Sequence, residues 1–198
     1  MNETDAARYE MFRAIGRDIF LSHMISSHGG NMSVREGDDI YITRTGSQLG
    51  RLKETDIVRV SAATPSALDA SASSELVVHR AIYNATDARA VVHAHSLHTV
   101  FRSMIDDVIK PLDSEARLFI PEVPVLTSKT TIGSSNAAAL VAQALGANPI
   151  AVLRGHGPFA CAQTLDDAYR WVSVLEGSCQ LLDMADKSPR PLKDYLDF

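Results

Sequence analysis

The residues best suited to chemistry in this sequence are two histidines, His93 and His95, at the end of a short apolar run. Residues 90–95 are predicted to form a buried β-strand. Residues two apart in a strand point to the same face, about 6 to 7 Å apart, so both imidazoles can converge on one metal ion. Histidine pairs also occur as hydrogen-bonded structural residues, and the pair alone leaves both interpretations open.

A third histidine, His156, lies between Gly155 and Gly157, directly after the predicted buried strand 150–153. Glycines at such a place let the backbone approach a ligand closely, although His156 could equally be an ordinary turn residue. Three neutral imidazoles with one open position are typical of a catalytic zinc site, because a closed site cannot accept a substrate.

Glu75 is the carboxylate that would complete this set. It lies in the first turn of a predicted helix, behind Ser73 and Ser74. A carboxylate beside a metal can ligate the ion or transfer protons as an acid and base. A glutamate at a helix start is more often a capping or dipole residue, and without the histidines that interpretation would be preferred.

Three short segments of small and polar residues form a second set of candidates: residues 29–31, 45–46 and 73–74. Each can offer backbone N–H groups and hydroxyl or amide donors, and the third sits at a helix N-terminus, which favours an anion. Together they could hold a phosphate, although turn chemistry explains each segment taken alone. The sequence has neither GxxxxGK[ST] nor GxGxxG, so the usual nucleotide phosphate sites are not supported.

Predicted strands and helices alternate along the chain and would position these residues. This alternation predicts a sheet with helices on both faces, and residues 106–120 are expected to form an irregular loop. The expected helices are 5–24, one beginning near residue 75, 96–104, 134–145 and 165–184, and the expected strands are 31–35, 40–43, 57–61, 90–95, 122–126, 150–153 and 159–161.

Composition places the chain among globular proteins. Its 198 residues are 45% hydrophobic, which predicts one domain over residues 1–198. A net charge of −5 argues against a general nucleic-acid or anionic-membrane binder.

The apolar runs are far shorter than the ~20 residues a bilayer span requires, and the N-terminus has no signal pattern, so a cytoplasmic location is expected. Cys161 and Cys179 are expected to be reduced, buried thiols.

Five short motifs occur in one order across residues 29–157: GGNMSVR, ITRTG, SSE, VVHAH and LRGHG. In this order they resemble the class II aldolase/adducin family, and within it the group of L-fuculose-1-phosphate aldolases. The resemblance covers nearly the whole chain. It implies an α/β fold, a three-layer α/β/α domain around a central, largely antiparallel sheet. It also implies a homotetramer with active sites between neighbouring subunits.

Carried over residue by residue, the resemblance assigns roles that agree with the candidates above. It makes His93, His95 and His156 the ligands of one zinc ion per subunit, with Glu75 as a catalytic carboxylate that can also ligate the resting metal. The residues that it assigns to a substrate phosphate are Gly30, Asn31, Thr45, Gly46, Ser73 and Ser74.

One departure concerns a tyrosine that fuculose-phosphate aldolases use as an acid. This chain has no tyrosine between Tyr83 and Tyr169. At about that place lies Glu115, which resembles in position the catalytic glutamate of related methylthioribulose-1-phosphate dehydratases. A plain loop carboxylate is an equal alternative for Glu115. The family's C-terminal tail tyrosine has only a loose match in Tyr195.

The function implied is that of a metal-dependent lyase of carbohydrate metabolism. It would cleave a phosphorylated sugar, a ketose 1-phosphate like fuculose 1-phosphate, into dihydroxyacetone phosphate and a short aldehyde such as lactaldehyde. Alternatives within the family are a methylthioribulose-1-phosphate dehydratase, a pentulose-phosphate 4-epimerase and a tetronate-phosphate decarboxylase. An alternative of another class is a non-catalytic, adducin-like interaction domain, against which the three histidines and Glu75 argue.

Overall fold

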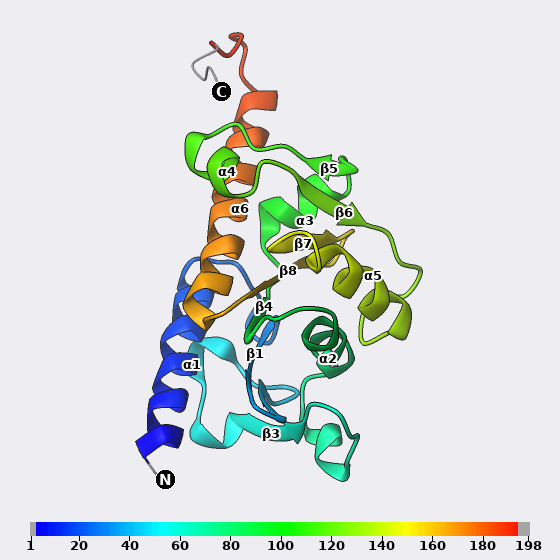
Figure 1. Cartoon of the computed structure of the whole chain (residues 1–198). Coiled ribbons are helices and arrows are strands. Elements are labelled where there is room, and N and C mark those ends of the chain that lie inside the picture. Colours follow the sequence, from blue (N-terminus) through cyan, green and yellow to red (C-terminus); the bar gives the residue numbers. More distant parts are fainter. Residues whose placement is uncertain (1–2, 194–198) are drawn as a thin grey trace.

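The computed structural model describes residues 3–193, in which strands and helices alternate along the chain (Figure 1). The strands are β1 Asn31–Glu36, β2 Asp39–Thr43, β3 Ile57–Ser61, β4 Ala90–His93, β5 Val108–Ile109, β6 Val123–Leu126, β7 Ile150–Leu153 and β8 Gly157–Ala162. The helices are α1 Glu3–Leu21, α2 Leu76–Ala85, α3 Leu97–Ser103, α4 Ser114–Phe119, α5 Ser135–Leu145 and α6 Leu165–Asp186, with 3₁₀ turns η1 Leu49–Arg51, η2 Glu54–Asp56 and η3 Ala67–Ser71.

The strands form one sheet in the order β3-β2-β1-β4-β8-β7-β6-β5. Within the described residues, β6 and β7 pair in parallel and the other neighbouring strands pair antiparallel. The sheet is therefore largely antiparallel, as expected. In the register of β1 with β4, Asn31 lies opposite His93, which brings a phosphate candidate next to a metal candidate.

Helices cover both faces of the sheet, with α1 and α6 on one side and α2 and α5 on the other (Figure 1). Strand β4 separates the two cores because alternate side chains of a strand point to opposite faces. Ala90 and Val92 belong to the core under α1 and α6, and Val91 belongs to the core under α2 and α5. The predicted three-layer α/β/α arrangement is confirmed. The part of the chain that the structure describes has no helix long and apolar enough to cross a membrane.

Several predicted boundaries differ from the structure by one to three residues, and two of these bear on the site. Helix α1 ends at Leu21 rather than at Met24, because His23 adopts a left-handed φ of 58°. The His23 N–H then donates to the Phe20 carbonyl and the Met24 N–H to the Ile19 carbonyl, the usual C-terminal closure of a helix. Strand β4 ends at His93 rather than at residue 95.

The segment expected to be an irregular loop contains strand β5 and helix α4. Asp113 caps α4, because its Oδ1 accepts a hydrogen bond from the Ala116 N–H at 2.9 Å. Ala116 and Ile120 are buried and fix the helix against the core. Both cysteines are free and buried, as expected.

Candidate active site

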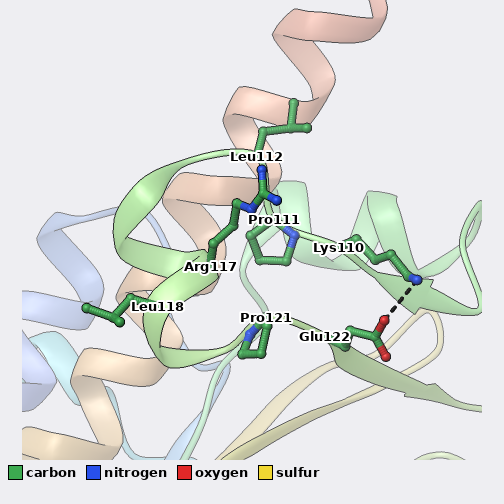
Figure 2. A pocket seen from close by; sticks show the side chains of 7 residues that line it. All are labelled: Lys110, Pro111, Leu112, Arg117, Leu118, Pro121 and Glu122. Carbon is green, nitrogen blue, oxygen red and sulfur yellow. Dashed lines mark ion pairs between the residues drawn. The ribbon is translucent and has the colours of Figure 1, made fainter. Parts of the chain in front are cut away.

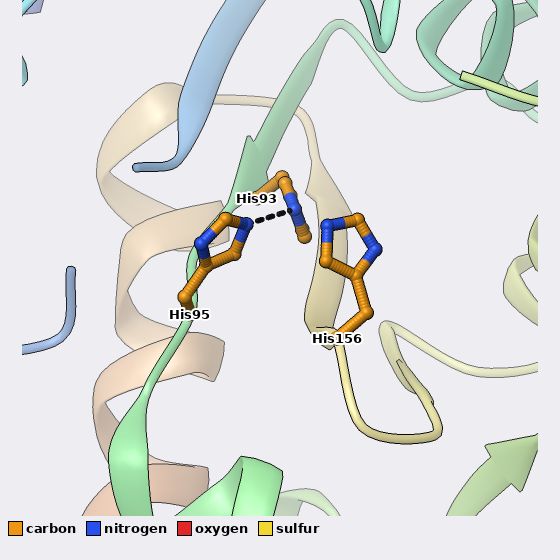
Figure 3. Close-up of side chains that lie close together, drawn as sticks. All are labelled: His93, His95 and His156. Atoms are coloured by element: carbon orange, nitrogen blue, oxygen red, sulfur yellow. Dashed lines mark hydrogen bonds between the residues drawn. The ribbon is translucent and has the colours of Figure 1, made fainter. Parts of the chain in front are cut away.

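The three predicted histidines meet at one end of the central strands. His93 closes β4, His95 follows it, and His156 lies in the turn between β7 and β8 (Figure 3). One ring nitrogen of each lies within 4.8 Å of the others, and the Nε2 atoms of His93 and His95 are 3.0 Å apart. The structure therefore brings together side chains that are more than 60 residues apart in the sequence.

The backbone orients these rings. Nδ1 of His93 lies 2.9 Å from the carbonyl oxygen of Pro158, so it donates a proton there and leaves Nε2 free for a ligand. His95 lies beyond the strand, and its N–H donates to the carbonyl of Met24 at 3.0 Å. His95 thus lies two residues past the end of the strand, and not within it as predicted.

Gly157 allows the His156 turn to approach the His95 segment. It has a φ of +153°, and a Cβ atom there would lie 2.1 Å from the carbonyl oxygen of Ala94. No side chain fits that space, so only glycine permits this contact. The His156 N–H donates to the Leu153 carbonyl at 2.9 Å and closes the turn.

The histidine group fits a divalent metal ion. Burial lowers the pKa of all three imidazoles, that of His156 to about 4 and that of His93 well below its usual value, so each is neutral near pH 7. Within the described chain, Nδ1 of His156 is buried and has no hydrogen-bond partner. Neutral nitrogen donors facing a common point are the ligands that zinc takes, and three of them leave coordination positions for a substrate.

Glu75 lies beside this group without being part of it. It is the N-cap residue of α2 and is buried, and its Oε1 accepts a hydrogen bond from the Gly133 N–H at 3.1 Å. Oε2 is buried without a partner among residues 3–193. Burial raises the pKa of this carboxyl, and the Gly133 N–H partly offsets that effect. A carboxyl group with a raised pKa is suited to take up and return a proton.

One cavity of about 180 Å³ joins the two sets of candidates. The three histidines and Glu75 form part of its wall, and the remaining predicted residues that line it are Gly30, Asn31, Thr45, Gly46, Ser73 and Ser74. Every site residue predicted from the sequence except Glu115 thus lies at this cavity.

Two backbone N–H groups of the cavity are already engaged within the protein. The Thr45 N–H already donates to the Ser71 carbonyl, and the Ser73 N–H donates to the Thr43 carbonyl. These two backbone groups are therefore not available to an anion. The hydroxyl groups and the Asn31 amide are side-chain donors that can bind one.

Four further cavity residues were not predicted: His28, Arg44, Ser47 and Ile132. Arg44 lies inside the ITRTG motif, and its charge is the signal that could have singled it out, because guanidinium groups pair well with phosphate. Its Nε donates to the carbonyl of Thr55 at 2.9 Å. Ile132 comes from the segment before α5, and nothing in the local sequence indicates that it reaches the cavity.

Glu115 is not at this cavity. It is exposed on α4, and it does not line the cavity of its own chain.

A larger hollow of about 540 Å³ lies beside α4, and an ion pair of 2.8 Å between Lys110 and Glu122 forms part of its wall (Figure 2). No histidine or cysteine lines this hollow, so it offers none of the chemistry of the histidine cavity. Tyr195 lies outside the described residues.

A fourth histidine beside the cavity, His79, is fully buried and makes the stability of the fold depend on pH. Burial lowers its pKa to about 3, whereas an unfolded histidine has a pKa of about 6.5. Between these values the unfolded chain binds a proton that the folded chain does not, so stability is full above about pH 6.5 and is lost as the pH falls.

We therefore expect His79→Gln to make the dependence of the unfolding free energy on pH shallower, by up to about 1.4 kcal/mol per pH unit between about pH 4 and 6. Urea unfolding of metal-free protein at several pH values measures this slope. An unchanged slope would mean that His79 is already protonated in the folded state.

Comparisons with known proteins show the family of the chain. The sequence model described as Class II Aldolase and Adducin N-terminal domain matches residues 10–182. The chain belongs to this family. A crystal structure of L-fuculose-1-phosphate aldolase from Thermus thermophilus is similar, with a TM-score of 0.87 and 38% identity over 92% of this chain and 97% of that one.

Two curated relatives extend the comparison within the class II aldolase family. L-fuculose phosphate aldolase of Methanocaldococcus jannaschii is 34% identical over 87% of this chain and 93% of its own length. A 3-oxo-tetronate 4-phosphate decarboxylase of Escherichia coli is 28% identical over 92% of this chain and 88% of its own length. Membership of this family supports a lyase activity on a phosphorylated sugar. Class II aldolases depend on a metal, and the three-histidine group is where one could bind.

Proposed function

We propose that the protein is a zinc-dependent aldolase that cleaves a ketose 1-phosphate, such as fuculose 1-phosphate, into dihydroxyacetone phosphate and a short aldehyde such as lactaldehyde. The observation that carries the proposal is the single cavity in which three neutral histidines, a buried carboxylate and a set of hydroxyl and amide donors meet. The similarity to L-fuculose phosphate aldolases at 34% and 38% identity supports the substrate class.

Each part of the cavity would have one task. His93, His95 and His156 would hold the metal, whose charge would stabilise the negative charge that develops on the substrate's oxygen atoms. Asn31, the hydroxyl groups of Thr45, Ser73 and Ser74, and the turns at Gly30 and Gly46 would hold the phosphate, and Arg44 would add positive charge. The phosphate would thus fix one end of the substrate.

Glu75 would move the proton at carbon. Cleavage breaks the carbon–carbon bond next to the ketone, and the bond's electrons stay with the dihydroxyacetone phosphate half. The hydroxyl group of the departing half loses its proton as it becomes the aldehyde, and Glu75 donates a proton to the carbon of the other half. The raised pKa of Glu75 and its unpartnered Oε2 support this role. When no substrate is present, the same oxygen could ligate the metal.

The hydroxyl proton of the departing half requires a second group, and we assign it to Glu115 of a neighbouring subunit. Glu115 is exposed and lies outside the cavity of its own chain, so it could act only at the cavity of another copy. A homotetramer with active sites between subunits, which the family resemblance implies, would supply that contact.

The phosphate assignment predicts the effect of removing two hydroxyl groups. The double variant Ser73→Ala, Ser74→Ala should raise KM for fuculose 1-phosphate by roughly a hundredfold or more, because two hydrogen bonds to a charged group at about 1.5–3 kcal/mol each sum to about 3–6 kcal/mol. Steady-state kinetics measure this, with the exposed Ser22→Ala as a control that keeps the parent KM. If the parent enzyme handles unphosphorylated fuculose equally well, the phosphate assignment is wrong.

Other members of the family define the competing reactions. A relative named a decarboxylase is 28% identical, and dehydration or 4-epimerisation of a pentulose phosphate could use the same metal and phosphate groups. An adducin-like interaction domain would bind no metal and turn over no sugar. Identification of the products formed from phosphorylated ketoses distinguishes these possibilities.

A further inference from the structure

A chain of four buried polar groups leads from the core to the cavity. The hydroxyl of Tyr83 lies 2.7 Å from Oγ of Ser33, and that Oγ lies 2.6 Å from Nδ1 of His79. Nε2 of His79 lies 2.6 Å from Oδ1 of Asn31, which lines the cavity. Ser33 and His79 have no exposed surface, and Tyr83 and Asn31 are 2% and 6% exposed.

The donors and acceptors of this chain can be assigned in one direction. Oδ1 of Asn31 only accepts hydrogen bonds, so Nε2 of His79 must carry the proton. His79 is neutral because burial lowers its pKa to about 3, and its Nδ1 therefore accepts from the Ser33 hydroxyl. Ser33 in turn accepts from the Tyr83 hydroxyl. Each hydroxyl or imidazole proton of Tyr83, Ser33 and His79 then has an acceptor, as buried polar groups require.

This direction determines what Asn31 presents to the cavity. Its carbonyl oxygen is engaged by His79, so its Nδ2 group, with two N–H donors, is left for the cavity. Among the residues that the structure describes, no group accepts a hydrogen bond from Nδ2. A flipped amide would instead point its oxygen at a bound phosphate, and its Nδ2 would donate to an unprotonated Nε2 of His79, which reverses the chain.

We infer that His79 is a positioning residue for phosphate recognition: it holds the Asn31 amide with its N–H groups facing the substrate's phosphate. The inference rests on the proposed phosphate site. His79 comes from α2, the helix that begins directly after Glu75, so one helix supports both the proton-transfer group and the phosphate contact. Orienting the amide before the substrate arrives lowers the cost of binding.

A double-mutant cycle tests this role. The affinity of the metal-loaded protein for dihydroxyacetone phosphate is measured by calorimetry for the wild type, Asn31→Ala, His79→Leu and the double variant. We expect each single variant to lose roughly tenfold or more in affinity, and the double variant to lose no more than Asn31→Ala alone, because His79 acts only through Asn31. Elemental analysis should show unchanged metal content in all four proteins.

Two further measurements do not depend on His79→Leu being folded. His79→Gln keeps an N–H donor near the position of Nε2 and should restore affinity to within about threefold of the wild type. In the wild-type protein, ¹H–¹⁵N NMR of the imidazole should show a proton on Nε2 and none on Nδ1. A proton on Nδ1 would reverse the chain and overturn the inference.

The outcomes separate this inference from the proposed function. If the wild type binds dihydroxyacetone no more weakly than dihydroxyacetone phosphate, the phosphate site itself is wrong. If the wild type prefers the phosphorylated ligand but the losses of the two single variants add up in the double variant, His79 is only a structural residue and the positioning role is refuted.

Discussion

Glu75→Gln is expected to abolish both cleavage of the ketose phosphate and the metal-dependent exchange of hydrogen between dihydroxyacetone phosphate and water. Glutamine keeps the size of the side chain but cannot take up the proton, and general acid–base groups contribute about 10²- to 10⁴-fold. Exchange is followed by NMR in deuterated water, and cleavage by coupled detection of dihydroxyacetone phosphate. Retention of full exchange in this variant would remove Glu75 from the proton transfer at carbon.

Glu115→Gln is the matched comparison, because it should lose cleavage by a similar factor and keep the exchange reaction, in which no aldehyde takes part. Since Glu115 would act from a neighbouring subunit, mixing Glu75→Gln and Glu115→Gln subunits in one oligomer should restore some cleavage. Equal loss of exchange in both variants would place Glu115 at the first proton transfer or in the scaffold. No loss of cleavage in Glu115→Gln would make it a plain surface carboxylate.

Loss of the metal is the second large effect expected. His95→Ala leaves two of the three nitrogen donors, and elemental analysis of the purified variant should find metal only at background level, with cleavage lost in parallel. His28→Ala is a suitable control, because His28 lines the same cavity but contacts Ser27 and Gln48 rather than the histidine group. Wild-type metal content in His95→Ala, or full activity after chelator treatment without measurable metal, would refute the metal site.

The parts of the site that could be predicted from the sequence are those carried by short, local signals. His93 and His95 follow an apolar run, His156 follows another, and the glycine at each end of the His156 turn is visible in the motif LRGHG. The order of strands and helices was predictable for the same reason, because apolar periodicity is a local property. Three-layer packing then follows from the alternation of these elements.

The remaining features depend on contacts between distant segments. In the sequence, His79 is one more residue of a predicted helix. Only the hydrogen bond between His79 on α2 and Asn31 on β1 shows that the two residues are in contact. The Gly133 N–H reaches Glu75 across 58 residues of sequence. The helix α4 that carries Glu115 could not be predicted either, because the cap at Asp113 that starts this helix lies in a segment with two flanking prolines, which favour a loop.

Product analysis with phosphorylated ketoses tests the central claim most directly. Metal-loaded protein is incubated with fuculose 1-phosphate, methylthioribulose 1-phosphate, a pentulose phosphate and a 3-oxo-tetronate 4-phosphate, and the products are identified by NMR and mass spectrometry. We predict dihydroxyacetone phosphate and lactaldehyde in equal amounts from fuculose 1-phosphate, and no such turnover in the Glu75→Gln variant. Loss of water, inversion of a carbon centre or release of carbon dioxide from one of the other substrates, with fuculose 1-phosphate left intact, would contradict the proposed aldolase activity.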